Sequence, residues 1–148
     1  MKIIDIHSHF NIGSKFDCAE SEFNKRNFDF VKKEYADFGI SAGGFCPYSS
    51  VSRDTDSFEK IYEDNEFTYR LSEENDFIYQ WIVLHPERKE LFNQIEKRIT
   101  CRKVLGIKIH PYYHGYDINA YGDRVFSFAN SLKCWVLVHP FPGKTMEL

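Results

Sequence analysis

Several features are absent from this sequence, and each absence narrows the class of protein. The apolar runs are short, well below the ~20 residues that a membrane-spanning helix needs. The N-terminus lacks the charged-then-apolar pattern of a secretory signal. No run of lysine or arginine indicates a nucleic-acid groove, and the formal net charge is −3. These absences favour a cytoplasmic protein that binds neither nucleic acid nor membrane.

Paired cysteines are also missing. The four cysteines (Cys18, Cys46, Cys101 and Cys134) are scattered, and no C-x-x-C motif occurs. A disulfide framework or a structural zinc knuckle is therefore not expected, and a reducing cytoplasm fits this pattern. We interpret Cys46 as a buried core thiol.

What the chain does contain is enough apolar surface for one domain. Its 148 residues include 43% hydrophobic and 17% aromatic residues. This length is that of a single domain with a substantial core, so residues 1–148 are interpreted as one unit.

Apolar strands alternate with amphipathic helices along the whole sequence. This order is typical of a parallel sheet with right-handed helical crossovers, as in α/β folds. Strands are predicted at 2–10, 40–46, 77–84, 104–110 and 134–139, and helices at about 21–38, 56–74, 87–100 and 118–132.

Histidines gather at the ends of the predicted strands. Two close the first strand, and three later strands end in His-Pro. Because the carboxyl ends of parallel strands meet at one edge, where α/β folds place their active sites, we expect these side chains to lie together. The expected group is His7, His9, His85, His110 and His139. We interpret His85 as structural and His114, just beyond the edge, as a loop residue.

Strand alternation predicts which side chains face inward in a (β/α) barrel. Asp5, His7 and His9 share one face of the first strand. Asp5 is placed to orient an imidazole or to line the floor of the site. Two histidines of one strand and a third from another make a three-nitrogen metal site with a position open for water. The inward set is His7, His9, Lys108, His110 and His139.

Three motifs resemble those of one enzyme family. The stretch from Asp5 to His9 resembles the D-x-H-x-H opening of the amidohydrolase superfamily of metal-dependent TIM-barrel enzymes. Residues 106–111 (GIKIHP) resemble the fourth-strand signature of its amidohydrolase-related branch, and residues 136–139 (VLVH) resemble its fifth-strand signature. Gly39-Ile40 fits the usual step before the second strand.

This resemblance implies a divalent metal, usually zinc, held by His7, His9 and His139. It also implies hydrolysis of an amide, ester or lactone, with non-oxidative decarboxylation as the alternative, since the branch hosts both. Some superfamily members carry a carboxylated bridging lysine at the strand of Lys108. In this branch Lys108 is better interpreted, with His110 and Asp5, as a polar group near the substrate or behind the ligands.

The sequence departs from the family pattern in its second half. A full barrel takes about 200 to 250 residues. The family's sixth-strand histidine ligand and its eighth-strand aspartate base have no counterpart here. We therefore expect a barrel truncated after its fifth strand. It is either the first part of such an enzyme or a catalytically inactive half-barrel, kept as an interaction partner or as a remnant. Open edges at the first and fifth strands predict a homo-oligomer.

Overall fold

The computed structural model describes residues 2–9, 20–50 and 55–139, and the statements below concern this part of the chain. Each predicted strand and helix is present there, with small shifts at the ends. The 3₁₀ turn η1 was not predicted. The elements are β1 (Ile3–His9), α1 (Glu20–Phe38), β2 (Ile40–Cys46), η1 (Tyr48–Ser50), α2 (Thr55–Glu74), β3 (Ile78–Val83), α3 (Lys89–Arg98), β4 (Val104–Ile109), α4 (Ile118–Ser131) and β5 (Trp135–Val138).

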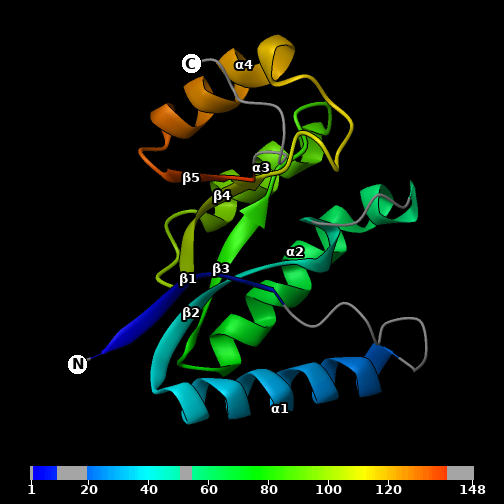
Figure 1. Cartoon of the computed structure of the whole chain (residues 1–148). Helices are drawn as coiled ribbons and strands as arrows, with labels where there is room; N and C mark the ends of the chain where they lie inside the picture. The colour runs from blue at the N-terminus through cyan, green and yellow to red at the C-terminus, as the bar shows by residue number, and fades with distance from the viewer. Residues whose placement is uncertain (1, 10–19, 51–54, 140–148) are drawn as a thin grey trace.

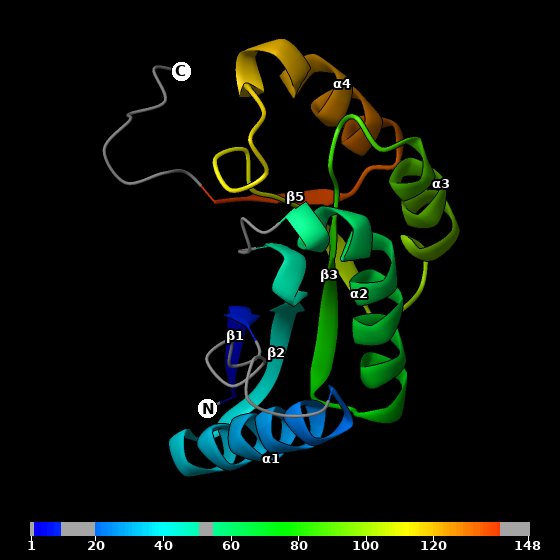
Figure 2. The ribbon, with the colours of Figure 1, turned by 90° about the vertical axis from the view of Figure 1, so that its right-hand side faces the viewer.

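The five strands form one parallel sheet in the order β1-β2-β3-β4-β5. The sheet curls, and α1 to α4 follow its outer side (Figures 1 and 2). This is the half-barrel of a TIM-type α/β fold, as the sequence predicted. No helix within the described residues combines the length and apolar character needed to cross a bilayer.

The apolar core lies between the sheet and its helices. At one end, Val31 and Tyr35 of α1 pack with Phe45 and Ile78. At the other, α2, α3 and α4 pack on β3 and β4. That larger cluster consists of Ile61, Ile82, Val83, Leu84, Leu91, Ile95, Ile107, Ile109, Val125 and Ala129. The aliphatic faces of β4 and β5 therefore point outward, which leaves the mixed polar faces inside.

A buried amide network ties α2 to the centre of the sheet. The Asn65 side chain donates to the Val83 carbonyl at 3.0 Å and to Gln94 Oε1 at 2.9 Å. Its Oδ1 accepts from the Val83 N–H at 2.9 Å. Because buried polar groups are costly without partners, this network orients α2, β3 and α3 relative to one another.

Strand β1 is anchored from two strands away. The Trp81 indole on β3 donates from Nε1 to the Ile6 carbonyl oxygen at 2.8 Å. It crosses β2 at Gly44, where a Cβ atom would lie 2.6 Å from Trp81 Nε1 and 2.8 Å from the Ile6 oxygen. Gly44 is thus required by close packing, because only a residue without a side chain leaves room for this bond.

This packing predicts opposite outcomes for two glycine substitutions. Gly44→Ala should lower the free energy of unfolding by about 1–3 kcal/mol, the usual cost of overpacking. Gly122→Ala is the matched control, because its Cβ would meet nothing closer than 3.7 Å. Alanine there should be neutral or stabilising by up to about 1 kcal/mol. Urea denaturation of both variants checks this, and equal stabilities would contradict the role of Gly44.

Candidate metal centre at the carboxyl edge of the sheet

All six histidines of the sequence form one continuous row at the carboxyl edge of the sheet. The order is His9, His7, His139, His110, His114 and His85. Successive ring centroids are 4.8, 5.7, 4.3, 6.3 and 5.8 Å apart. Parallel strand order produces this row, because each strand delivers its terminal residue to the same edge. The histidines that the sequence placed at one edge of the sheet therefore lie next to one another in the structure.

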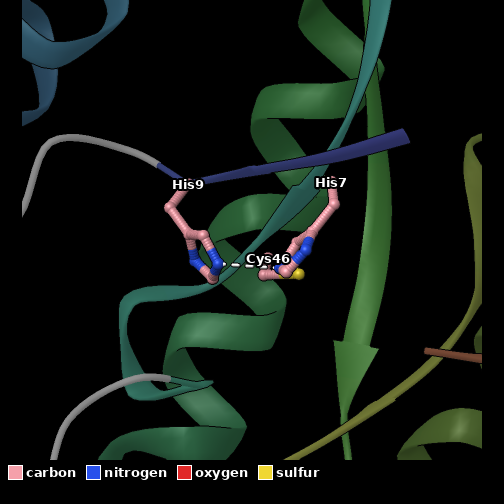
Figure 3. A group of neighbouring side chains, drawn as sticks. All are labelled: His7, His9 and Cys46. Atoms are coloured by element: carbon pink, nitrogen blue, oxygen red, sulfur yellow. Dashed lines mark hydrogen bonds between the residues drawn. The ribbon is translucent and has the colours of Figure 1, made fainter. Parts of the chain in front are cut away.

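The tightest part of the row joins β1 to β2. His7 Nε2 and His9 Nε2 lie 2.9 Å apart. A ring nitrogen from each of them and Sγ of Cys46 all lie within 4.8 Å of one another. The three side chains point toward one another, as Figure 3 shows. Cys46 is fully buried, as predicted, but the sequence reasoning did not foresee that it would face the two histidines.

Lys108 lies on the inner face of β4 and reaches this cluster. Its Nζ is 3.3 Å from His7 Nε2, although its own side chain is completely buried. Burial lowers the pKa of the Lys108 ammonium. The Lys108 amine therefore lies beside His7 as a cation or a hydrogen-bond donor. Its side chain points inward, as the strand alternation predicted.

His110 and His139 lie next to His7. Their rings stack at 4.3 Å with an interplanar angle of 18°. The Tyr113 N–H donates to His110 Nδ1 at 3.4 Å. Two other atoms of this pair, His110 Nε2 and His139 Nδ1, are buried without a hydrogen-bond partner in the part of the chain that the structure describes. Such orphaned atoms mark a place where a metal, water or substrate group completes the bonding. Pro140, predicted to close this strand, lies outside the described residues.

Asp5 does not follow the alternation expected for β1. The β1–β2 register is irregular between Asp5 and Ser8, so the two-residue repeat is broken there. Asp5 Oδ2 accepts a bond from the Tyr35 hydroxyl of α1 at 3.2 Å, and Oδ1 accepts from the His7 N–H at 3.0 Å. Tyr35 packs on the outer face of the sheet with Phe45. Asp5 therefore holds the backbone of His7 from the helix side, whereas the sequence placed its side chain inward with the imidazole.

The far end of the row is bonded to backbone groups. His114 Nε2 lies 2.9 Å from the Ser49 carbonyl oxygen, and His85 Nε2 lies 3.2 Å from the His114 carbonyl oxygen. Both side chains are buried, and the His85 ring contacts Tyr116 at 5.3 Å. These two histidines join the loops that follow β2, β3 and β4, which agrees with a structural role for His85 and gives His114 one as well.

The electrostatic environment keeps the row neutral. Burial, followed by the nearby Lys108 and His139, lowers the pKa of His7. Burial and neighbouring positive charges lower the pKa of His9 to about 4 and that of His110 to about 3. Burial also lowers the pKa of His139. At neutral pH these imidazoles are uncharged, so their lone pairs are available to a metal ion.

The donor set fits a divalent cation. Two nitrogens that each lie about 2.0–2.1 Å from a tetrahedral zinc ion are about 3.3 Å apart. The His7–His9 separation of 2.9 Å is close to this, so a small movement of the two rings would admit the ion. His139 Nδ1, which has no partner among the described residues, is a further nitrogen on a ring beside His7. Burial raises the pKa of Cys46 to about 12, so its thiol stays protonated until a cation binds.

Comparison with known proteins finds a likeness of fold but not of sequence. The sequence matches no known family model and no curated protein. The fold is similar to a crystal structure of a variant of 5-carboxyvanillate decarboxylase from Novosphingobium aromaticivorans with bound manganese and 3-methoxy-4-hydroxy-5-nitrobenzoic acid. The TM-score is 0.63 at 14% identity, over 94% of this chain and 51% of that one. The likeness establishes the fold, and the chain spans about half the length of that relative.

Proposed function

We propose that this chain forms the metal-binding part of an amidohydrolase-related enzyme, a metal-dependent hydrolase of a small amide, ester or lactone. The observation that carries the proposal is the pair of neutral imidazoles, His7 and His9, with their Nε2 atoms 2.9 Å apart at the carboxyl edge of a half-barrel. The three motifs in the sequence and the similarity of fold to a decarboxylase with bound manganese support it.

In this proposal His7, His9 and His139 hold a divalent cation, with zinc as the expected metal. The cation supplies a Lewis acid that lowers the pKa of water and polarises a carbonyl oxygen. Lys108 and His110 face the same space from β4 and bind the polar groups of the substrate. The buried ammonium of Lys108 attracts an oxygen that carries negative charge, and His110 Nε2 has no partner within the described residues.

The orphaned polar atoms at this edge favour a small polar substrate. Besides those of His110 and His139, Ser49 Oγ and Tyr116 Oη are buried without a hydrogen-bond partner among residues 2–9, 20–50 and 55–139. Ser49 is on η1 and Tyr116 is in the loop after β4, so the substrate would be held by the loops that follow the strands. In barrels of this type those loops determine specificity.

Non-oxidative decarboxylation is the second candidate. It is favoured by the similarity to a decarboxylase that was crystallised with a nitrobenzoic acid. A row of neutral histidines beside a buried ammonium is also suited to a substrate carboxylate. Hydrolysis and decarboxylation would use the same cation and the same histidines, so the products distinguish them.

Metal binding tests the proposed ligands. The purified chain should bind one equivalent of zinc by elemental analysis and calorimetry. His7→Ala/His9→Ala should weaken binding by more than about 100-fold, beyond the 10–100-fold that is typical of residues outside the ligand shell.

Ser8→Ala is the matched control, because it alters the same strand between the two ligands and should leave the affinity unchanged. Unchanged metal content in the double variant would exclude His7 and His9 as ligands.

Product analysis tests the reaction. The zinc-loaded chain should hydrolyse lactones or aryl esters in a reaction that His7→Ala/His9→Ala abolishes. Release of carbon dioxide from hydroxybenzoic acids, with no hydrolysis, would replace the hydrolase by the decarboxylase. A chain that binds metal but does neither would support the inactive half-barrel.

That third candidate, a half-barrel that acts through association, also has an observation behind it. In the described sheet β1 and β5 are the edge strands, and apolar side chains are exposed on both. Trp135 of β5 is 78% exposed, and Ile4 and Ile6 of β1 are 66% and 59% exposed. Exposed apolar edge strands are sites of pairing with another chain, here a second copy of this one.

Light scattering tests this association. The unmodified chain should form a dimer or larger species, and Trp135→Glu should shift it toward the monomer, because a charge on the edge strand opposes pairing. Phe126→Glu is the control, since Phe126 is 43% exposed but lies on α4. A monomeric unmodified chain would rule out the association.

A further inference from the structure

Cys46 occupies a defined place beside the two proposed ligands of β1. It ends β2, and its Cα atom is the register partner of His9 in the parallel pair β1–β2. Residues paired in this way project side by side from neighbouring strands. Sγ therefore lies in the same group as a ring nitrogen of His7 and one of His9, all within 4.8 Å of one another.

The direction of the Cys46 side chain is imposed by its neighbour. Phe45 is fully buried on the outer face, where it contacts Tyr35 of α1 at 5.7 Å between ring centroids. Successive side chains of a strand point to opposite faces, so Cys46 must point to the inner face. There it meets imidazoles, as Figure 3 shows, rather than the apolar surroundings expected for a core thiol.

The two other described cysteines differ from Cys46. Cys134 precedes β5, and its thiol donates to the Ala129 carbonyl at 3.6 Å. Cys101 lies in the turn between α3 and β4 and is not fully buried. Within the described residues, Cys46 alone among the cysteines shares a group of metal-binding side chains.

We propose that Cys46 is a thiolate ligand of the cation held by His7 and His9. The inference rests on the proposed metal site and specifies its chemistry. On binding, the S–H bond breaks, the proton passes to solvent and a sulfur–metal bond forms, with no change of oxidation state. The buried Lys108 ammonium, which acts on the thiol, favours the resulting negative charge.

A thiolate in the ligand set decides which metals the site prefers. Thiolate is a soft ligand that favours zinc and cobalt over manganese, whereas carboxylates and water suit manganese. The site should therefore select zinc or cobalt(II), in contrast to the manganese present in the structural relative. With His139 included, the set would be three imidazoles and one thiolate, so a water molecule would bind as a fifth ligand, an expansion that catalytic zinc sites allow.

Cobalt(II) spectroscopy tests the ligand directly. The cobalt-loaded chain should show the intense near-ultraviolet charge-transfer band of a cobalt–thiolate bond. Cys46→Ser should abolish this band, while Cys134→Ser, the matched control, should keep it. Retention of the band in Cys46→Ser would overturn the proposal. Circular dichroism establishes that each variant is folded.

A second measurement needs no variant. X-ray absorption of the zinc-loaded, unmodified chain should show a sulfur scatterer at about 2.3 Å in addition to nitrogen. Nitrogen and oxygen neighbours alone would exclude Cys46 and leave the histidine site standing. Failure of the histidine site has a different signature, because His7→Ala/His9→Ala would then bind cobalt as well as the unmodified chain.

Discussion

The hydrogen bond from Trp81 to the Ile6 carbonyl is the contact on which the candidate site depends. Strand β1 is an edge strand of the described sheet, and it carries His7 and His9. Its ladder to β2 is irregular just where these residues lie. The Trp81 indole reaches over Gly44, and its Nε1 donates to the Ile6 carbonyl oxygen at 2.8 Å. Ile6 directly precedes His7, so this bond holds β1 beside the first proposed ligand. Asp5 accepts from the His7 N–H, which belongs to the same peptide group as the Ile6 carbonyl, so this peptide is held by a hydrogen bond at each end.

Neutral histidines in a row are a consequence of burial and of mutual repulsion. Burial is the largest cause, because a proton on a buried ring would be desolvated. Lys108 and His139 then lower the pKa of His7, His9 and His110 further. The row nevertheless has two different ends. His114 and His85 are bonded to carbonyl groups of the loops, whereas His7 and His9 are bonded to each other. The same residue type therefore stabilises the loops at one end and offers lone pairs at the other.

The sequence predicted the elements and the edge, because both follow from periodic patterns. Apolar alternation located the strands, and parallel order then placed their terminal histidines together. The predictions were weaker where one side chain decides the local geometry. No pattern in the sequence marks Gly44, yet it makes room for Trp81. Asp5 was assigned to the inner face, but an irregular register turns it toward Tyr35. A two-residue repeat predicts which face a side chain takes in a regular strand. It predicts neither an irregular strand register nor a contact that spans two strands.

Cys46 and His139 are the two candidates for further ligands, and the fold brings them to His7 by different routes. Cys46 arrives through the pairing of adjacent strands, which depends only on register. His139 arrives from β5, the opposite edge of the sheet, so its approach to 5.7 Å from His7 requires the sheet to curl. Changes in curvature would move His139 relative to β1 but leave Cys46 beside His9. A cation bound by His7, His9 and Cys46 would therefore persist in an open half-barrel, and recruiting His139 would couple the cation to closure of the sheet.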